Sequence, residues 1–155
     1  MCGFAGFSDY GDSLREERYL WMALARRMAG RIAHRGPDDR GEHVSNHVAL
    51  SHVRLSVIDP EKGVQPMTKK AGGHSYTIAY NGEVYNAAEL RRELEALGHV
   101  FETDCDTEVV LNAYIEYGEN CAEKLNGIFA FAVDDTPRGH TFLCRDRFGV
   151  KPLFY

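Results

Sequence analysis

Apolar positions along the chain follow two different periods, which predict strands interleaved with helices. Residues 2–8 (CGFAGFS) form a short apolar run with glycines that is typical of a strand. Residues 44–58 alternate and are rich in Val, Leu and Ile, so they predict two strands with a turn at residues 46–47. Residues 75–82 (SYTIAYNG) predict a further strand that ends in a turn.

Three segments repeat apolar residues every three or four positions, which predicts helices over residues 13–30, 86–98 and 106–118. The first segment opens with a capping box at residues 13–16 (SLRE), and all three end at a glycine, which suits a helix C-terminus. The expected apolar faces are Leu20, Trp21, Leu24 and Met28 in the first helix, Leu90, Leu94 and Leu97 in the second, and Val109, Val110, Ala113, Tyr114 and Tyr117 in the third.

The last part of the chain predicts a strand, a turn and a strand. Residues 127–135 and 140–145 are apolar runs, and they flank a turn sequence at residues 136–139 (TPRG). Antiparallel strand pairs with helices in separate blocks favour an α+β layered fold over a doubly wound parallel one. The 155 residues fit one domain, long enough to bury a core without metals or disulfides.

Charge and hydropathy exclude two classes of partner. The chain has 18 Lys plus Arg against 23 Asp plus Glu, a net charge of −5, whereas nucleic-acid binding requires a concentrated basic face. The longest uncharged apolar run, residues 128–133 (IFAFAV), is far shorter than the ~20 residues that span a bilayer. We therefore expect a cytoplasmic protein with no nucleic-acid and no membrane partner.

The four cysteines are scattered and form no CxxC pair. Their spacing indicates neither a zinc site nor a disulfide framework. We expect Cys105, Cys121 and Cys144 to pack as small, semi-buried side chains.

Cys2 is the exception, because it follows Met1 directly. If Met1 is removed, as a small second residue permits, one residue carries both a thiol and a free α-amine. An α-amine titrates near pH ~7.7–8 and a free thiol near ~8.5, so the amine can take the thiol proton at little cost. Cys2 is therefore a candidate nucleophile with its own base. Cys2 reactivity alone would also fit a redox or thiol-regulatory protein.

Asn81-Gly82 has two interpretations. A side-chain amide beside an unhindered backbone N–H could stabilise an oxyanion, a contribution of ~3–4 kcal/mol per donor. Asn-Gly is also the commonest signal of a hairpin turn, and taken alone the pair favours the turn.

Three charged residues match the two ends of an amino acid. Arg54 lies in an apolar, strand-like setting, where a guanidinium either pairs with an internal carboxylate or binds the carboxylate of a substrate. Glu83 and Asp106 could bind an ammonium group, although Asp106 could instead cap a helix.

These features, in order, resemble the glutaminase domain of class II glutamine amidotransferases, and more narrowly that of glutamine-dependent asparagine synthetases. The resemblance covers nearly the whole chain. Its blocks are MCGFAGF (1–7), HRGPDDRG (34–41), HVRLSVID (52–59), QPM (65–67), YNGEVYN (80–86), DTE (106–108), LNGIFAFAV (125–133) and RDRFGVKPLFY (145–155).

The resemblance implies a fold, a reaction and a set of roles. The fold is the N-terminal nucleophile hydrolase sandwich, with two antiparallel sheets between helical layers. The reaction is hydrolysis of glutamine to glutamate and ammonia through a cysteine thioester. The implied roles are nucleophile for Cys2, oxyanion hole for Asn81 and Gly82, α-carboxylate binding for Arg54, pocket lining for Leu55, Val57 and Ile58, and α-ammonium binding for Glu83 and Asp106.

The resemblance also implies partners. In the family, a second domain uses ATP and Mg to activate aspartate and receives the ammonia, whereas the glutaminase domain needs no cofactor. Residues 1–155 contain no phosphate-binding loop or SGGxDS-like segment of that second domain, and they end before the family's usual glutaminase boundary. Missing final strands would leave an open sheet edge, so we expect a homodimer or aggregation. A glutamine-sensing or subunit-interaction module of the same fold is the alternative to an enzyme.

Overall fold

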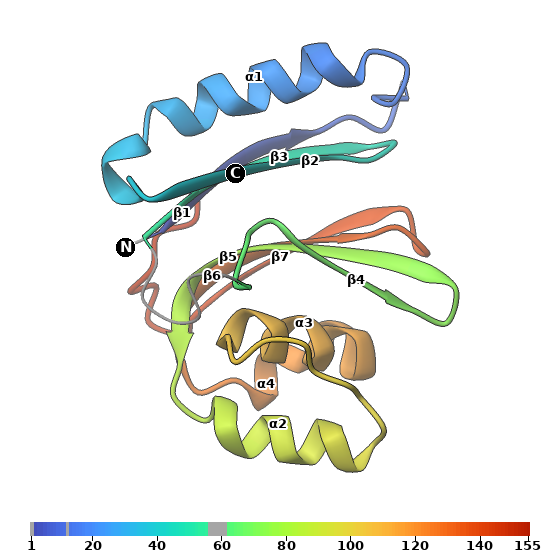
Figure 1. The fold of residues 1–155 in the computed structure, drawn as a ribbon, viewed down its shortest axis with the longest axis vertical. Coiled ribbons are helices and arrows are strands. Elements are labelled where there is room, and N and C mark those ends of the chain that lie inside the picture. Colours follow the sequence, from blue (N-terminus) through green and yellow to red (C-terminus); the bar gives the residue numbers. More distant parts are fainter. Residues whose placement is uncertain (1, 12, 56–61) are drawn as a thin grey trace.

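Residues 2–11, 13–55 and 62–155 are described by a computed structural model, in which they form two antiparallel sheets and several helices (Figure 1). One sheet has three strands in the order β1-β3-β2, and the other has four in the order β4-β5-β6-β7. The strands are β1 (Gly3–Ser8), β2 (Asp39–Val44), β3 (Val48–Arg54), β4 (Met67–Ala71), β5 (His74–Val84), β6 (Gly127–Asp135) and β7 (His140–Arg145). The α-helices are α1 (Arg18–Gly30), α2 (Ala87–Ala96), α3 (Asp106–Tyr117) and α4 (Cys121–Lys124), and two 3₁₀ turns cover Ala33–Arg35 and Gly118–Asn120.

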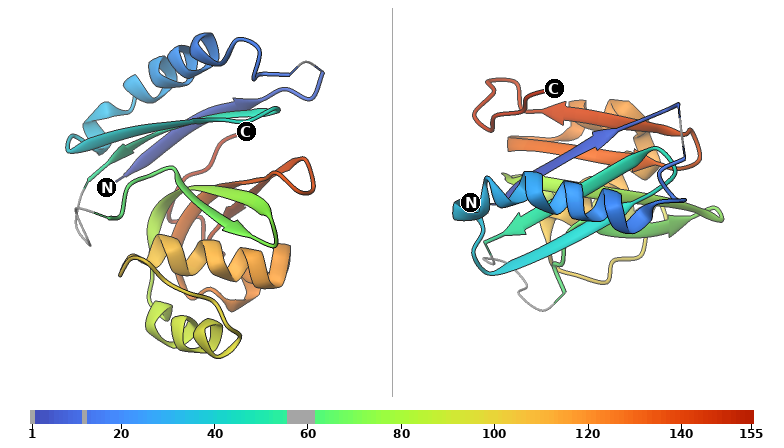
Figure 2. Two further views of the ribbon diagram at one scale, coloured as in Figure 1. Left: turned by 45° about the vertical axis from the view of Figure 1, so that its right-hand side comes forward. Right: turned by 90° about the horizontal axis from the view of Figure 1, so that it is seen from above.

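The sheets lie face to face between helical layers (Figures 1 and 2). Helix α1 covers the outer face of the three-stranded sheet, whereas α3 and α4 cover the outer face of the four-stranded sheet and α2 packs on α3. This is the αββα sandwich that the family resemblance implies, and the prediction of an α+β layered fold is confirmed.

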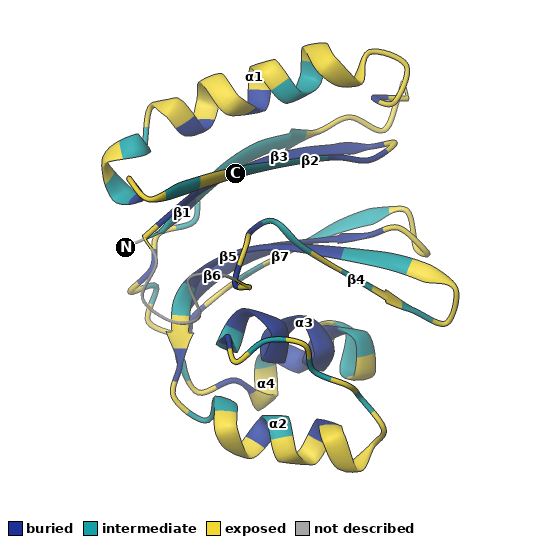
Figure 3. Ribbon diagram, in the orientation of Figure 1, coloured by how far each residue is buried: buried dark blue, intermediate teal, exposed yellow. Residues whose placement is uncertain are grey.

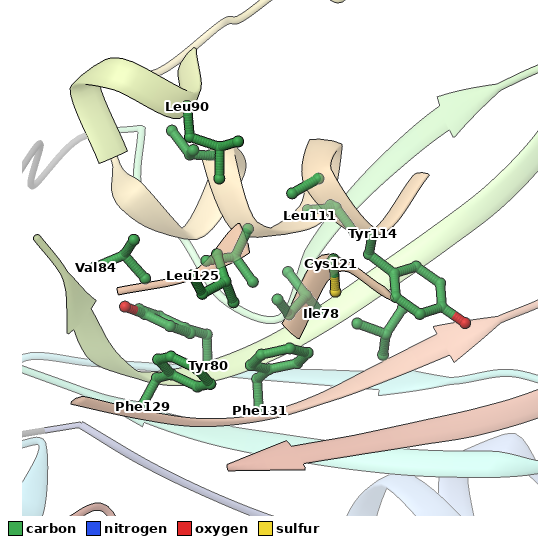
Figure 4. Close-up of a cluster of buried hydrophobic side chains, with 14 of the residues drawn as sticks. Ile78, Tyr80, Val84, Leu90, Leu111, Tyr114, Cys121, Leu125, Phe129 and Phe131 are labelled. Carbon is green, nitrogen blue, oxygen red and sulfur yellow. The ribbon is translucent and has the colours of Figure 1, made fainter. Parts of the chain in front are cut away.

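Each interface between layers has its own apolar core, and buried positions concentrate on the strands and on α3 (Figure 3). The largest core lies between the four-stranded sheet and the helices α2, α3 and α4 (Figure 4). A smaller one joins the two sheets through Val48, Leu50, Ala79 and Ala132. The third lies under α1 and consists of Leu14, Ala25, Val44 and Ala49.

The predicted turn at residues 46–47 is confirmed, and the other predicted strands are present, but β2 lies almost wholly before the predicted range of residues 44–58. The sequence pattern did not indicate β4, a five-residue edge strand of sequence MTKKA. Its two central lysines hide the apolar alternation, and charged residues of this kind are typical of exposed sheet edges. No helix within the described ranges is long and apolar enough to cross a membrane.

The first helix begins later than predicted. Helix α1 starts at Arg18, and no side chain caps its N-terminus, so the capping box at residues 13–16 is wrong. Leu14 is 1% exposed in the core under α1, and its backbone N–H donates to the Asn46 carbonyl at 2.9 Å. Because Leu14 is anchored to the sheet, the chain turns before it can begin the helix.

The buried face of α1 also differs from the predicted one. Ala25 and Ala29 are buried, and Trp21 packs against Phe7, whereas Leu20 is 54% exposed. Leu24 and Met28 are likewise exposed. The two small alanines allow the helix to lie close to the sheet, so that the larger side chains are turned outward.

The other two predicted helices form close to their expected bounds. Gly98 follows α2 with a φ of 96°, and Gly118 ends α3 with a φ of 60°, so both adopt a left-handed conformation that favours glycine. Leu97, expected on the buried face of the second helix, instead lies just past the end of α2 and is exposed.

We expect Leu14→Ala to lower the free energy of unfolding by about 2–5 kcal/mol, because it opens a cavity in the core under α1. Leu20→Ala, on the exposed face of the same helix, should cost less than about 1 kcal/mol. Urea unfolding of both variants measures the difference. Equal losses would show that Leu20, as the sequence pattern predicted, shares the core.

Candidate functional site

A pocket of about 260 Å³ opens where the chain enters β1 and leaves β3 and β5. Every predicted site residue within the described ranges lines this one pocket, whereas Val57 and Ile58 lie outside those ranges. The structure thus brings together residues that are far apart in the sequence. They are Cys2, Arg54, Leu55, Asn81, Gly82, Glu83 and Asp106.

Backbone groups hold Cys2 at the pocket wall. The β1–β3 register pairs Gly3 with Val53, which brings Cys2 to the end of β3. The Leu55 N–H donates to Cys2 Sγ at 3.4 Å, and the thiol lies 3.6 Å from the Leu55 carbonyl oxygen. Arg35 Nε donates to the Cys2 carbonyl at 3.0 Å, so both the sulfur and the backbone of Cys2 are fixed.

Asn81 and Gly82 lie inside β5, so the interpretation of this pair as a hairpin turn is wrong. Asn81 pairs with Ala130 of β6, and Gly82 pairs with Phe129. A Cβ atom at Gly82 would lie 2.5 Å from the Ile128 carbonyl oxygen, which is far too close. Glycine is needed here because β6 passes against it, and not because a turn requires it.

Backbone N–H groups of alternate residues in β5 point away from β6, toward the pocket side. The Tyr80 N–H donates to Gln65 Oε1 at 2.7 Å, and the Val84 N–H donates to Asp106 Oδ2 at 3.1 Å. Gly82 lies midway between them, so its N–H points to the same side. Strand β4 does not cover this side, because its pairing with β5 ends at Met67.

A buried cation and a half-buried anion lie in the pocket wall. Arg54, the last residue of β3, is only 4% exposed. Asp106 is the first residue of α3, and Cys105 is the cap residue, so the structure does not support Asp106 as the helix cap. Asp106 Oδ2 accepts hydrogen bonds from the Tyr80 hydroxyl at 2.6 Å and from the Val84 N–H.

The environment of Asp106 shifts its pKa upward. Burial is the largest cause, and the neighbouring Glu83 adds to it. The hydrogen bonds from Tyr80, Val84 and the Thr107 backbone act in the opposite direction because they stabilise the ionised form.

Sequence reasoning gave no role to several residues that line the pocket, among them Gln65, Tyr80, Thr107 and Lys151. Gln65 Nε2 donates to Thr107 Oγ1 at 3.3 Å and so joins the segment before β4 to α3. Gln65 lies in the QPM block and Lys151 in the RDRFGVKPLFY block. The family resemblance therefore included both residues but implied no role for either.

Asp146 shapes the segment that carries Lys151. Its Oδ1 accepts from the N–H groups of Phe148 and Val150 at 3.1 and 2.9 Å. Its Oδ2 accepts from those of Phe129 and Lys151 at 3.2 and 2.9 Å. These bonds lower the pKa of Asp146 against the effect of burial and tie Lys151 to β6.

A layered αββα fold with a cysteine at the start of its first strand is that of an N-terminal nucleophile hydrolase. The family described as "Glutamine amidotransferase domain" matches residues 1–155. The chain belongs to this family.

Two relatives support this family assignment. "Asparagine synthetase [glutamine-hydrolyzing] 3" of Bacillus subtilis (strain 168) is 49% identical over 155 residues, which are 100% of this chain and 25% of that protein. The nodule asparagine synthetase of Pisum sativum is 37% identical over 99% of this chain and 25% of its own length. The chain therefore spans about a quarter of the length of these relatives.

A solved structure supports the fold. Glutamine phosphoribosylpyrophosphate (PRPP) amidotransferase from B. subtilis, complexed with ADP and GMP, superposes with a TM-score of 0.50 at 30% identity. The match covers 59% of this chain and 22% of that one. The predicted resemblance and the predicted N-terminal nucleophile hydrolase fold are confirmed.

The environments of the cysteines predict an order of reaction with a thiol reagent. Cys105 and Cys121 are more fully buried than the semi-buried packing expected, and burial raises the pKa of Cys121 to about 12. Cys144 is half-buried, and burial raises its pKa to about 11. We expect iodoacetamide to modify Cys2, which lines the pocket, before the other three in the folded chain. Peptide mass spectrometry checks the order, and modification of Cys121 at the rate seen in denaturant would contradict this packing.

Proposed function

We propose that this domain hydrolyses L-glutamine to L-glutamate and ammonia, with Cys2 as the nucleophile. The observation that carries the proposal is that one pocket contains the Cys2 thiol, the buried Arg54 guanidinium and the half-buried Asp106 carboxylate. A nucleophile that shares one pocket with a fixed cation and a fixed anion suits an amino acid whose side chain is to be attacked. The family to which the chain belongs supports the same reaction.

The charges of the pocket match the charges of the substrate. In this proposal Arg54 binds the α-carboxylate, and Asp106 with Glu83 binds the α-ammonium group. Leu55 lines the space around the substrate, and the lining role expected of Val57 and Ile58, which lie outside the described residues, stays a prediction. The pocket volume of about 260 Å³ is close to the lower end of the range for small-molecule sites, which fits a single amino acid.

The reaction begins after removal of Met1, which gives Cys2 a free α-amine. The amine takes the thiol proton, and Sγ forms a bond to the side-chain carbonyl carbon of glutamine. The carbonyl oxygen becomes an oxyanion, which accepts hydrogen bonds from the Asn81 amide and the Gly82 N–H. The direction of the Gly82 N–H, away from β6, supports this role.

The intermediate then breaks its carbon–nitrogen bond. The protonated α-amine gives its proton to the leaving nitrogen, and ammonia departs while a γ-glutamyl thioester remains on Cys2. Water, deprotonated by the same amine, attacks the thioester carbon. Glutamate leaves and the thiol is restored, so the enzyme is unchanged and needs no cofactor.

Further proposals concern the larger protein. We infer that residues 1–155 form the glutaminase domain and that the ammonia serves an ATP-dependent synthetase domain, which makes asparagine from aspartate with ATP and Mg. The names of the relatives, and their fourfold greater length, support this inference. The cytoplasmic location and the homodimer expected from the sequence stay predictions.

Substitution of the nucleophile tests the reaction. We expect Cys2→Ala to reduce glutamate and ammonia release from glutamine to the uncatalysed rate, because no other group can form the thioester. Cys144→Ala, which removes a half-buried thiol from β7, is the matched control and should retain turnover. Full activity of Cys2→Ala would end the proposal. Glutamine binding without turnover in the processed, unsubstituted chain would favour a glutamine-sensing module instead.

A further inference from the structure

Tyr80 precedes the proposed oxyanion residue Asn81 in β5, and the proposed reaction gives it no role. Its ring is 2% exposed and belongs to the largest apolar core. Its hydroxyl leaves that core and donates to Asp106 Oδ2 at 2.6 Å. Tyr80 therefore connects the core of the domain to the carboxylate at the pocket.

We propose that Tyr80 is a positioning residue for glutamine binding, which acts by orienting Asp106 and by keeping its carboxylate ionised. The inference rests on the proposed function, because it takes Asp106 as the partner of the substrate's α-ammonium group.

The geometry around Asp106 supports the proposal that Tyr80 orients its carboxylate. Oδ2 receives two donors from β5, the Tyr80 hydroxyl and the Val84 N–H, so the rotation of the carboxylate is set by that strand. Tyr80 is itself fixed at its other end, where its N–H donates to Gln65 Oε1. Gln65 in turn donates to Thr107, the residue after Asp106. A closed set of hydrogen bonds thus ties the first turn of α3 to β5.

The electrostatic environment supports the proposal that Tyr80 keeps the Asp106 carboxylate ionised. Burial raises the pKa of Asp106, and the Tyr80 hydroxyl is the first of the groups that lower it. Burial, together with Asp106, raises the pKa of Tyr80 itself, so its hydroxyl stays a proton donor across the working range. Without this donor, Asp106 would take up a proton at a higher pH, and a neutral carboxyl group binds an ammonium group poorly. The other titratable or charged side chains that share the pocket with Asp106 are Cys2, Arg54, Glu83, Cys105 and Lys151.

The chain offers a matched control in Tyr114. It is 1% exposed in the same apolar core, and its hydroxyl donates to the buried Asp135 at 2.8 Å. Figure 4 shows the hydroxyls of Tyr80 and Tyr114 at opposite ends of the cluster. Asp135 is not among the residues that line the pocket. Removal of either hydroxyl therefore costs a hydrogen bond to a carboxylate, but only the Tyr80 hydroxyl reaches the site.

The first test is kinetic. We expect Tyr80→Phe to raise the KM for glutamine about tenfold at neutral pH, as loss of a hydrogen bond to a charged group implies, with kcat changed less than about twofold. Tyr114→Phe should leave both constants unchanged. Equal effects of the two variants, or a loss in kcat alone, would overturn the positioning role. Thermal unfolding of both variants shows whether their stabilities are matched.

The second test does not need turnover. Carbon-13 NMR titration of the Asp106 carboxyl group, in a Cys2→Ala background, should give a higher pKa with Tyr80→Phe than with Tyr80 or with Tyr114→Phe. An unchanged pKa would overturn the proposal. If the unsubstituted, processed chain fails to hydrolyse glutamine, the proposed function fails alone, and this titration still decides the link between Tyr80 and Asp106.

A measurement on unsubstituted Tyr80 covers the case in which Tyr80→Phe does not fold. The Tyr80 hydroxyl proton should resist exchange with solvent while Asp106 is ionised and exchange faster once Asp106 is protonated. Exchange that does not change across the titration of Asp106 would overturn the proposal.

Discussion

The site depends on the antiparallel pairing of β1 with β3. This pairing sets Gly3 opposite Val53, and it leaves the residue before β1 beside the residues that follow β3. A slip of one residue would turn every side chain of β1 to the other face of the sheet and would move Cys2 away from the Leu55 backbone. The hydrogen bond from Arg35 to the Cys2 carbonyl holds the same end of β1 from outside the sheet.

The opposite wall of the pocket depends on close contact between β5 and β6. Gly82 and Gly127 both lie where a Cβ atom would meet the partner strand's backbone, at 2.5 Å from the Ile128 oxygen and 2.2 Å from the Glu83 oxygen. The pairing with β6 continues as far as Val84, whose N–H reaches Asp106. One strand therefore carries the proposed oxyanion donors and also orients the proposed ammonium-binding carboxylate.

Much of the fold could be predicted from local patterns, since helix ends and tight turns depend on neighbouring residues. The left-handed glycines after α2 and α3 and the turn before β3 are examples. The start of α1 could not be predicted in this way, because the Leu14 N–H donates to the distant Asn46 carbonyl and Leu14 therefore stays outside the helix. The exposure of Leu20 could not be predicted for a similar reason. It depends on how closely Ala25 and Ala29 let α1 approach the sheet, which is a contact between distant parts of the chain.

The candidate site shows the same division. The nucleophile, the arginine and the carboxylates followed from residue chemistry and from the family resemblance, and the structure brings the described ones to one pocket. The interpretation of Asn81-Gly82 as a turn was wrong because the sequence of an Asn-Gly pair within a strand is the same as that of a turn. Only the pairing with β6 distinguishes the two. Tyr80 and Gln65 had no recognisable role because they act on residues 26 and 42 positions away, through single hydrogen bonds.

In the proposed reaction, residue 2, once it is the chain terminus, attacks the glutamine side chain with its own sulfur. The most direct measurement is intact-protein and peptide mass spectrometry after treatment with a glutamine analogue that bears an electrophile at the side-chain position. We expect a chain that lacks Met1 and carries one adduct on Cys2, formed more slowly when glutamine is in excess. A processed, folded chain with no adduct, or with its adduct on Cys105, Cys121 or Cys144, would contradict it.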